Sequence, residues 1–502
     1  MNASTDIAVL IVGAGPTGLT LACELARRGQ RVRIVEQNQG PMPGSRGKGL
    51  QPRTLELFDD LGIVDRVLAR GTPYPRMRVH WGPFAWGYDL MERGQRTDQV
   101  PYPNAWMVAQ ADTEASLRER LTELDVEVEY GCALRGFTQD ADAVRAELEH
   151  GTRSELVRTA YLLAADGGRS TVRKALGLTL QGRTLDEPSA LVGDLVLDGL
   201  ARDAWHVWPR ARSGAVALCP LPGGEKFQLL AQLEPGSSPP ALELAPVQAF
   251  LTHTLRSAKI GVRAVSWLSL YHPQSRMVDR YRVGRVLLAG DAAHVHPPTG
   301  GQGLNIGVQD SQNLGWKLAA VLDGAPDALL DTYQQERLPI AHKVLNLSTA
   351  LYERRARQRR GADTKQLGTN YRDSSLSVDV DISPGVRLRS GDRAPDAVTN
   401  TGRLFDVFRG AHFTVLAFGA DAARVQAQDA RVRSVHVSDS FDRGGKIAAA
   451  YQAVPGSVVV VRPDGYIASR SDKPRAFALD AYLGVTRCAP PHPDAWLDRE
   501  RR

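Results

Sequence analysis

The chain has 502 residues, too many for one compact core, so its length predicts two or three domains. Hydrophobic residues make up 43% and charged residues 24%, which is typical of globular proteins and excludes a disordered chain. The net charge of +6 is a small difference between 62 basic and 56 acidic residues, so it gives little support for a nucleic-acid partner.

No segment is predicted to direct the chain into or across a membrane. The first six residues lack the basic region and apolar stretch of a secretion signal. No apolar run approaches the roughly 20 residues of a membrane helix. The four cysteines, at positions 23, 132, 219 and 488, form no CxxC pair, which argues against a disulfide scaffold or a zinc site. We therefore expect a cytoplasmic protein with no metal and no membrane or nucleic-acid partner.

The first predicted elements form a βαβ unit. Residues 7–12 are an apolar strand, residues 13–18 a glycine-rich turn, residues 19–28 a helix, and residues 31–36 a second strand. This order is typical of the start of a cofactor-binding domain.

The glycine turn has the pattern of a dinucleotide site. Gly13 permits a tight turn, Gly15 lets the backbone approach a pyrophosphate, and Gly18 allows the helix to pack closely on the strand. The amides and the positive dipole end of the helix then face the phosphates. Glu36 ends the second strand, where its carboxylate can accept hydrogen bonds from both hydroxyls of an adenosine ribose. A glycine turn without a ligand is the alternative, disfavoured because strand, helix and acid are all in place.

The middle of the chain predicts a sheet inserted between two halves of the cofactor domain. Its expected strands are residues 191–197, 215–220 and 227–233. Three large aromatic residues there could line a pocket, but we favour ordinary core because large aromatics are mostly buried for packing: Trp205, Trp208 and Phe227.

Two further glycine and acid pairs follow predicted strands. Residues 161–165 lead into Asp166, and residues 286–289 lead into Gly290 and Asp291. A glycine turn at residues 300–303 then opens a helical pattern that continues to about residue 360. The end of that pattern contains five arginines, which we interpret as a solvated helix end rather than an anion site.

A separate unit begins after a polar link at residues 361–384. Its expected strands are residues 412–418, 432–437, 458–461 and 466–469, with a Pro-Asp-Gly turn before the last. Its one cysteine is Cys488. A unit without paired thiols cannot exchange disulfides, so we expect a structural or dimer-related role.

Three segments together, IVGAGPTG, DGGRSTVR and GDAAHVHPPTGGQGLN, occur in this order within residues 6–350. The sequence resembles the FAD-dependent aromatic hydroxylases, which are single-component flavoprotein monooxygenases of the para-hydroxybenzoate hydroxylase fold. It looks closest to the branch that acts on polyketides and antibiotics and has a thioredoxin-like C-terminal domain.

The resemblance implies an α/β architecture of three parts. A Rossmann-like FAD-binding domain would take residues 1–178 and 281–360, and an inserted β-sheet substrate domain would take residues 179–280. A thioredoxin-like α/β domain would take residues 385–502. A homodimer would fit this family.

The resemblance also implies a non-covalent FAD site. Arg46 and Gln110 would contact the FAD, Leu134 would present backbone to the adenine, and Asp291 would hold the ribityl or pyrophosphate region. The flavin ring would border Pro298 and the backbone of residues 301–305. The implied cofactor-binding residues are Gly13, Gly15, Pro16, Thr17, Gly18, Glu36, Gln37, Arg46, Gln110, Leu134, Asp166, Gly290, Asp291, Pro298, Gly301, Gln302, Gly303, Leu304 and Asn305.

Some of these positions have alternative interpretations. Asp166 is associated in the family with FAD and NADPH, but it could equally cap the helix that follows. Gly47 and Lys48 depart from the family pattern, which more often has small apolar residues there. His294 and His296 suggest a catalytic base or a metal site, yet we favour turn residues bonded to backbone and assign neither a role.

In such enzymes NADPH reduces the FAD, O2 reacts to give a flavin C4a-hydroperoxide, and one oxygen atom passes to an electron-rich ring. The protein positions the substrate and excludes water, so no catalytic side chain is assigned. We therefore expect a monooxygenase that uses NADPH or NADH and hydroxylates an aromatic or polyketide-type substrate. Baeyer–Villiger oxygenation and a non-oxygenating flavin dehydrogenase remain alternatives. A flavin halogenase is disfavoured because the spacing around residues 205–208 is wrong.

Overall fold

The computed structural model describes residues 6–184, 190–212, 214–234, 238–297, 300–353, 360–419, 429–475 and 477–484. Pro298, Cys488 and four of the five clustered arginines lie outside these ranges.

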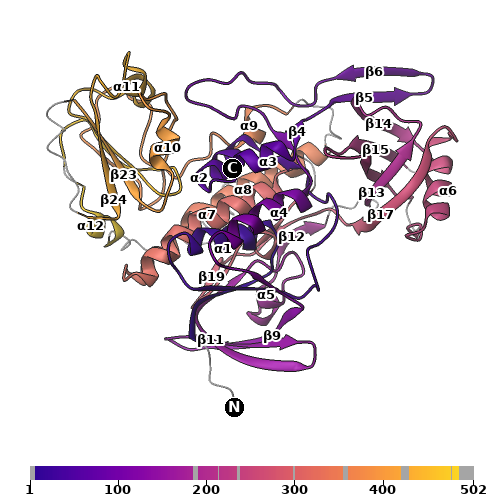
Figure 1. Cartoon of the computed structure of the whole chain (residues 1–502), viewed down its shortest axis with the longest axis horizontal. Coiled ribbons are helices and arrows are strands. Elements are labelled where there is room, and N and C mark those ends of the chain that lie inside the picture. The colour runs from indigo at the N-terminus through magenta and orange to yellow at the C-terminus, as the bar shows by residue number, and fades with distance from the viewer. Residues whose placement is uncertain are drawn as a thin grey trace, which may run out of the picture.

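The central unit is built on an eight-stranded sheet with helices packed against it (Figure 1). The strand order is β19-β20-β11-β1-β2-β8, and β9 and β10 extend it beside β11. The strands are β1 (Asp6–Val12), β2 (Val32–Glu36), β8 (Val128–Tyr130), β9 (Cys132–Gln139), β10 (Val144–His150), β11 (Arg153–Ala164), β19 (Arg282–Val283) and β20 (Val286–Leu288). The contiguous apolar residues of β1 are buried because this parallel strand is covered on both faces.

Helices α1 (Pro16–Ala26), α4 (Gln110–Thr122) and α7 (Gly303–Leu322) pack together on this sheet. The long helix α8 (Asp331–Glu353) follows α7. Short elements complete the unit: β3 (Gly49–Leu50), α2 (Pro52–Asp60), α3 (Val64–Ala69), β4 (Thr72–Pro73), β7 (Trp106–Met107), α5 (Thr171–Ala175), β12 (Gln181–Thr184), β18 (Gln274–Met277), β21 (His294–Val295) and α9 (Ala362–Lys365). The expected βαβ start is confirmed, although α1 begins earlier, at a proline whose fixed φ suits the first helical turn.

A seven-stranded sheet with α6 (Leu244–Leu255) lies on one side of the central unit (Figure 1). Its order is β17-β13-β16-β15-β14-β5-β6. The strands are β5 (Arg76–Trp81), β6 (Phe84–Tyr88), β13 (Ala190–Asp198), β14 (Ala204–Ala211), β15 (Gly214–Pro220), β16 (Lys226–Gln232) and β17 (Gly261–Tyr271). The hairpin of β5 and β6 comes from sequence far before residue 179. This sheet is therefore larger than the inserted segment alone, because β14 pairs in parallel with β5.

A C-terminal unit lies on the opposite side, orange to yellow in Figure 1. Its mixed five-stranded sheet has the order β22-β26-β25-β23-β24. The elements are β22 (Val378–Val380), α10 (Leu404–Phe408), β23 (Phe413–Phe418), β24 (Val432–Val437), α11 (Lys446–Tyr451), β25 (Val458–Val461), β26 (Ile467–Ser471) and α12 (Leu479–Gly484). All four strands expected here are present, and the mixed pairing is that of an α/β unit.

A buried cluster of charges joins the C-terminal unit to the central unit. Glu336 of α8 accepts hydrogen bonds from Lys317 of α7 and Arg462 of the C-terminal unit, each at 2.7 Å. Asp464 accepts a hydrogen bond at 3.0 Å from the indole N–H of Trp316. The four charged side chains of the cluster, Lys317, Glu336, Arg462 and Asp464, are buried, so each charge depends on its partners.

Helices long and apolar enough to span a bilayer are absent from the part of the chain that the structure describes.

Candidate active site

The three glycines in the turn after β1 have different surroundings. Gly13 has φ +102°, and a Cβ there would lie 2.4 Å from the Ala165 carbonyl oxygen. A Cβ on Gly18 would lie 1.9 Å from the Gly13 oxygen, so only glycine lets α1 pack on the turn. A Cβ on Gly15 would meet nothing within 4 Å. Open space therefore borders the backbone at the position where a pyrophosphate would approach.

Glu36 stands at the end of β2 beside this turn. Its carboxylate accepts hydrogen bonds from the backbone N–H of Ala14 and of Asn38, both at 3.0 Å. The side chain is half-buried, and the following Gln37 is exposed. The two backbone bonds fix the carboxylate at the rim of the open space beside Gly15.

Gly290 and Asp291 lie against the glycine turn at residues 13–18. A Cβ on Gly290 would lie 2.5 Å from Thr17 Oγ1, and Ser311 of α7 donates a hydrogen bond at 2.7 Å to the Thr17 carbonyl. Thr17 and its neighbour Pro16 are half-buried. The close approach brings Gly290 and Asp291 next to the turn, although Gly290 lies 273 residues after Thr17.

Asp291 has an exposed side chain although protein atoms surround it on most sides. This combination is expected of a residue that faces a recess rather than bulk solvent. Burial raises the pKa of Asp291, and the nearby His294 opposes that rise. A Cβ on Gly303 would lie 3.9 Å from Asp291 Oδ1, so the carboxylate lies near the first turn of α7.

The first turn of α7 is held by its own polar side chains. Asn305 donates to the carbonyls of Gly49 and Gly301 at 2.8 and 2.6 Å and accepts from the N–H of Gln51 at 2.7 Å. Gln302 is buried. Its side-chain amide donates hydrogen bonds to the carbonyls of Gly300 and Thr364 and accepts one from Gln366. Its side chain therefore fixes the turn, and only its backbone is available to a ligand.

Residues 46 and 47, which precede β3, lie near the first turn of α7. The backbone N–H of Gly47 donates at 3.2 Å to Oε1 of Gln110, the first residue of α4. A Cβ on Gly47 would lie 3.5 Å from the half-buried Leu304. Arg46 is exposed. The structure thus brings Arg46, Gln110 and Leu304 to one region, next to the α7 turn.

Asp166 lies against the glycine turn, because a Cβ on Gly13 would lie 2.9 Å from the Asp166 Cα, and Leu134 lies on β9. Asp166 accepts hydrogen bonds from the N–H groups of Thr171 and Val172 at 2.8 and 3.2 Å, so it caps α5 as one of its two interpretations requires. Its other oxygen is buried without a hydrogen bond to the described residues. Leu134 is 8% exposed on β9.

The environment of His294 and His296 differs from the one we expected. We expected turn residues bonded to backbone. Instead His294 bonds Asp310 at 2.7 Å through Nε2 and His296 at 3.1 Å through Nδ1. Asp310 also accepts a hydrogen bond at 2.7 Å from Arg337. Both ring nitrogens of His294 are therefore occupied, and the pair is part of a buried network under Gly290, whose N–H also bonds Asp310.

Trp205 also differs from expectation. Phe227 is buried in the sheet core as predicted, and Trp208 packs partly against that core. Trp205 is half-buried, and the Lys48 ammonium lies 4.2 Å from its ring centre. The sequence did not reveal this contact because Lys48 belongs to the central unit and Trp205 to the sheet.

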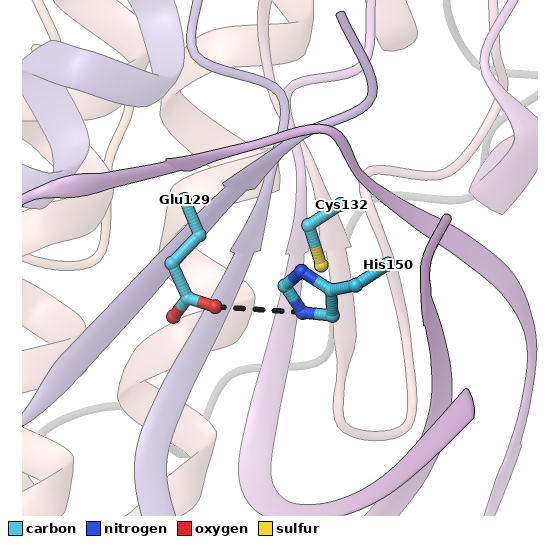
Figure 2. A group of neighbouring side chains, drawn as sticks. All are labelled: Glu129, Cys132 and His150. Atoms are coloured by element: carbon cyan, nitrogen blue, oxygen red, sulfur yellow. Dashed lines mark ion pairs between the residues drawn. The ribbon is translucent and has the colours of Figure 1, made fainter. Parts of the chain in front are cut away.

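One group of possible metal ligands lies away from this site. Glu129, Cys132 and His150 come from three neighbouring strands and converge as Figure 2 shows. Both oxygens of Glu129 already accept hydrogen bonds from Arg33, at 2.5 and 2.8 Å. Burial raises the pKa of the Cys132 thiol to about 11, which opposes the thiolate that a metal needs. We assign no metal to this group.

Two family descriptions match the chain: "FAD binding domain" over residues 6–348 and "Aromatic-ring hydroxylase, C-terminal" over residues 387–486. A flavin-dependent monooxygenase of Mycobacteroides abscessus is 45% identical over 93% of this chain and 98% of its own. The 6-methylpretetramide 4-monooxygenase of Streptomyces rimosus is 33% identical over 96% and 94%.

Solved structures of the same kind are also similar. Aklavinone-11 hydroxylase, determined in a ternary complex with FAD and aklavinone, has a TM-score of 0.81 and 30% identity over 97% of this chain and 99% of its own. The flavin-dependent monooxygenase PieE, in complex with FAD and substrate, has a TM-score of 0.83 and 25% identity over 96% and 99%. The glycine turn, the two strand-end acids and these matches lead to one conclusion: the chain belongs to the FAD-dependent aromatic-ring hydroxylases, a family of flavoprotein monooxygenases.

Proposed function

We propose that this enzyme places one oxygen atom of O2 on the ring of an aromatic, polyketide-type substrate as a hydroxyl group, at the expense of NADPH or NADH. The observation that supports it most is the convergence of three distant segments, at residues 13–18, 290–291 and 301–305, around one recess. Several relatives act on such compounds, as the names of 6-methylpretetramide 4-monooxygenase and aklavinone-11 hydroxylase state.

The residues of this recess fit FAD bound without a covalent bond. Open space at Gly15 and the N-terminus of α1 suit the pyrophosphate, and Glu36 suits the adenosine ribose. Asp291 suits the ribityl chain, and the amides at the start of α7 suit the ring, where a helix dipole stabilises negative charge. The other implied residues are assigned to the same cofactor. When bound, FAD would supply the redox chemistry and the activation of oxygen.

We also propose a role for each of the three parts of the chain. Residues 1–178 and 281–360 would bind FAD, the sheet built from residues 179–280 would bind the substrate, and residues 385–502 would be structural. The sheet is in a position to cover the recess, because Tyr271 of β17 donates a hydrogen bond at 2.7 Å to the His296 carbonyl. The cytoplasm, where NADPH and NADH are produced, would be the place of action.

Isotope labelling tests the reaction. With heavy-isotope O2, one heavy atom should appear in the product as a ring hydroxyl, and NADPH oxidation should accelerate when the substrate binds. Label in a lactone would instead identify the Baeyer–Villiger reaction. Oxidation of the substrate without label would identify a dehydrogenase and refute the monooxygenase proposal for this chain.

We further propose that two copies associate through β6. This strand forms the edge of the seven-stranded sheet, and Phe84 and Trp86 on it are 72% and 51% exposed. Its sequence, FAWGY, alternates aromatic and small residues symmetrically about Trp86. An antiparallel second copy would pair aromatic with aromatic on one face, and edge strands favour such pairing. Light scattering should report a dimer and, for Trp86→Lys, a monomer that retains FAD. A monomeric parent chain would refute this proposal.

A further inference from the structure

Lys48 stands at the junction between the central unit and the seven-stranded sheet. It directly precedes β3, and its backbone carbonyl accepts a hydrogen bond at 3.1 Å from Val108. Its ammonium bonds Gln228 Oε1 on β16 and lies over the Trp205 ring of β14. Lys48 therefore reaches from the neighbourhood of the α7 turn to the sheet that would cover the cofactor.

Other hydrogen-bond donors gather around this ammonium. The indole N–H of Trp205 is buried and has no acceptor among the described residues. The ring of Tyr74 lies 6.3 Å from that of Trp205, and the Tyr74 hydroxyl lies against Gly49, next to Lys48. The Arg360 guanidinium interacts electrostatically with Lys48 and Tyr74. The group thus contains two cations, a phenol, the Cys219 thiol, which interacts with Lys48, and an indole N–H without an acceptor among the described residues.

The described residues provide no carboxylate that pairs with either cation. Asp194 is near Lys48, but both its oxygens are engaged: by Ser45 through its N–H and hydroxyl, and by Trp267 through its indole N–H at 2.8 Å. Burial lowers the pKa of Lys48 and of Arg360, as expected for cations in protein surroundings without a matching anion. An anion arriving here would relieve that cost.

We propose that Lys48, with Trp205, Tyr74 and Arg360, binds an ionised enol or phenol oxygen of the aromatic substrate. The inference rests on the proposed function, since it names the substrate class for that reaction. Lys48 and Trp205 would donate charge-assisted hydrogen bonds to the oxygen, and Arg360 would complete the neutralisation. An ionised ring oxygen makes the ring more electron-rich, which suits attack on oxygen by the ring carbon. Lys48 is then a binding and positioning residue that orients the ring.

The experiment compares two matched ligands on the oxidised, FAD-loaded enzyme. The acidic enol is 2-hydroxy-1,4-naphthoquinone, and its neutral counterpart is 2-methoxy-1,4-naphthoquinone. Isothermal titration calorimetry gives both affinities without turnover. The parent enzyme should prefer the hydroxy compound by on the order of tenfold or more, because charge-assisted bonds in a partly buried site are strong.

Three variants test the assignment to Lys48. Lys48→Met should abolish the preference and leave the methoxy affinity and the FAD content within about twofold. Lys48→Arg should keep part of the preference. Lys259→Met removes an equal charge from an exposed position at the end of the sheet unit and should change nothing.

The proposal is wrong if the parent enzyme binds both compounds equally or binds neither, or if Lys48→Met retains the preference. A Lys48→Met chain that loses FAD would assign Lys48 to the cofactor instead and would equally overturn it. Because these are binding measurements on oxidised enzyme, they are independent of the labelling experiment. Failure to incorporate oxygen would refute the proposed reaction and leave the anion site standing.

Discussion

Asp291 shows how the position of a single side chain determines what it can bind. Its carboxylate is accessible to water and lies near the first turn of α7, in the recess proposed for FAD. A hydroxyl of a bound ribityl chain would replace that water and donate to the carboxylate. Hydrogen bonds to an ionised acceptor are stronger than those between neutral groups, so this one side chain should contribute measurably to FAD affinity.

Asp291→Ala should therefore weaken FAD binding by on the order of tenfold to a hundredfold, the equivalent of one charge-assisted hydrogen bond. Fluorescence titration of FAD-stripped protein would measure the change. Asp142→Ala, at an exposed loop, is the control and should bind FAD like the parent. Unaltered FAD affinity of Asp291→Ala would remove this residue from the proposed site.

The residues of the recess were predictable where a short motif fixes them. Gly13, Gly15 and Gly18 lie within six residues of one another, and the demand for glycine at positions 13 and 18 follows from steric limits alone. The network around His294 was not predictable, because Asp310 meets His294, and Arg337 meets Asp310, only after α7 and α8 pack. Lys48 and Trp205 likewise meet only when the sheet closes on the central unit.

At the scale of elements, the strands of the buried sheets were the best predicted. β1, β13 and β25 are apolar runs or alternating segments that pattern alone identifies. The hairpin of β5 and β6 was missed as part of the seven-stranded sheet. Its residues lie in the first third of the chain, and nothing local specifies a parallel partner such as β14, more than 110 residues away in the sequence.

The C-terminal unit offers a test at this scale. Its sheet is that of an α/β unit, but the only cysteine in residues 385–502 is Cys488, outside the described residues. Cys488→Ser should leave steady-state turnover unchanged, because a single thiol cannot cycle between dithiol and disulfide. Substrate-dependent NADPH oxidation measures this. A large loss of activity, with an unchanged circular dichroism spectrum, would show that the thiol has a redox role.

At the scale of the whole molecule, the charge cluster around Glu336 connects two units. Burial opposes ionisation of Glu336, but Arg462 and Lys317 hold the pKa of its carboxyl well below the ordinary range. The unfolded chain binds this proton more readily than the folded chain does. Stability from Glu336 is therefore complete above the ordinary pKa of about 4.3 and is lost as pH falls below it.

Glu336→Gln should lower the free energy of unfolding at neutral pH by about 3 to 5 kcal/mol, because it leaves two buried cations without their shared anion. The variant should also lose less stability than the parent between neutral pH and pH 3. Urea unfolding at several pH values would measure both effects. The exposed pair Arg135 and Glu149 supplies the control, since Glu149→Gln should change stability by less than about 1 kcal/mol. Parallel pH curves for parent and Glu336→Gln would contradict the assignment.

The same cluster limits how this enzyme can be recombined with its relatives. α7 begins at the recess proposed for FAD, and its C-terminal half contains Trp316 and Lys317, which contact residues of the charge cluster. A chimera that exchanges everything after residue 386 must bring an arginine at position 462 and an acid at position 464. Otherwise Lys317 and Glu336 lose their outer partners within the buried end of that helix. The two units must therefore be exchanged as a matched pair, although only one of them faces the recess proposed for FAD.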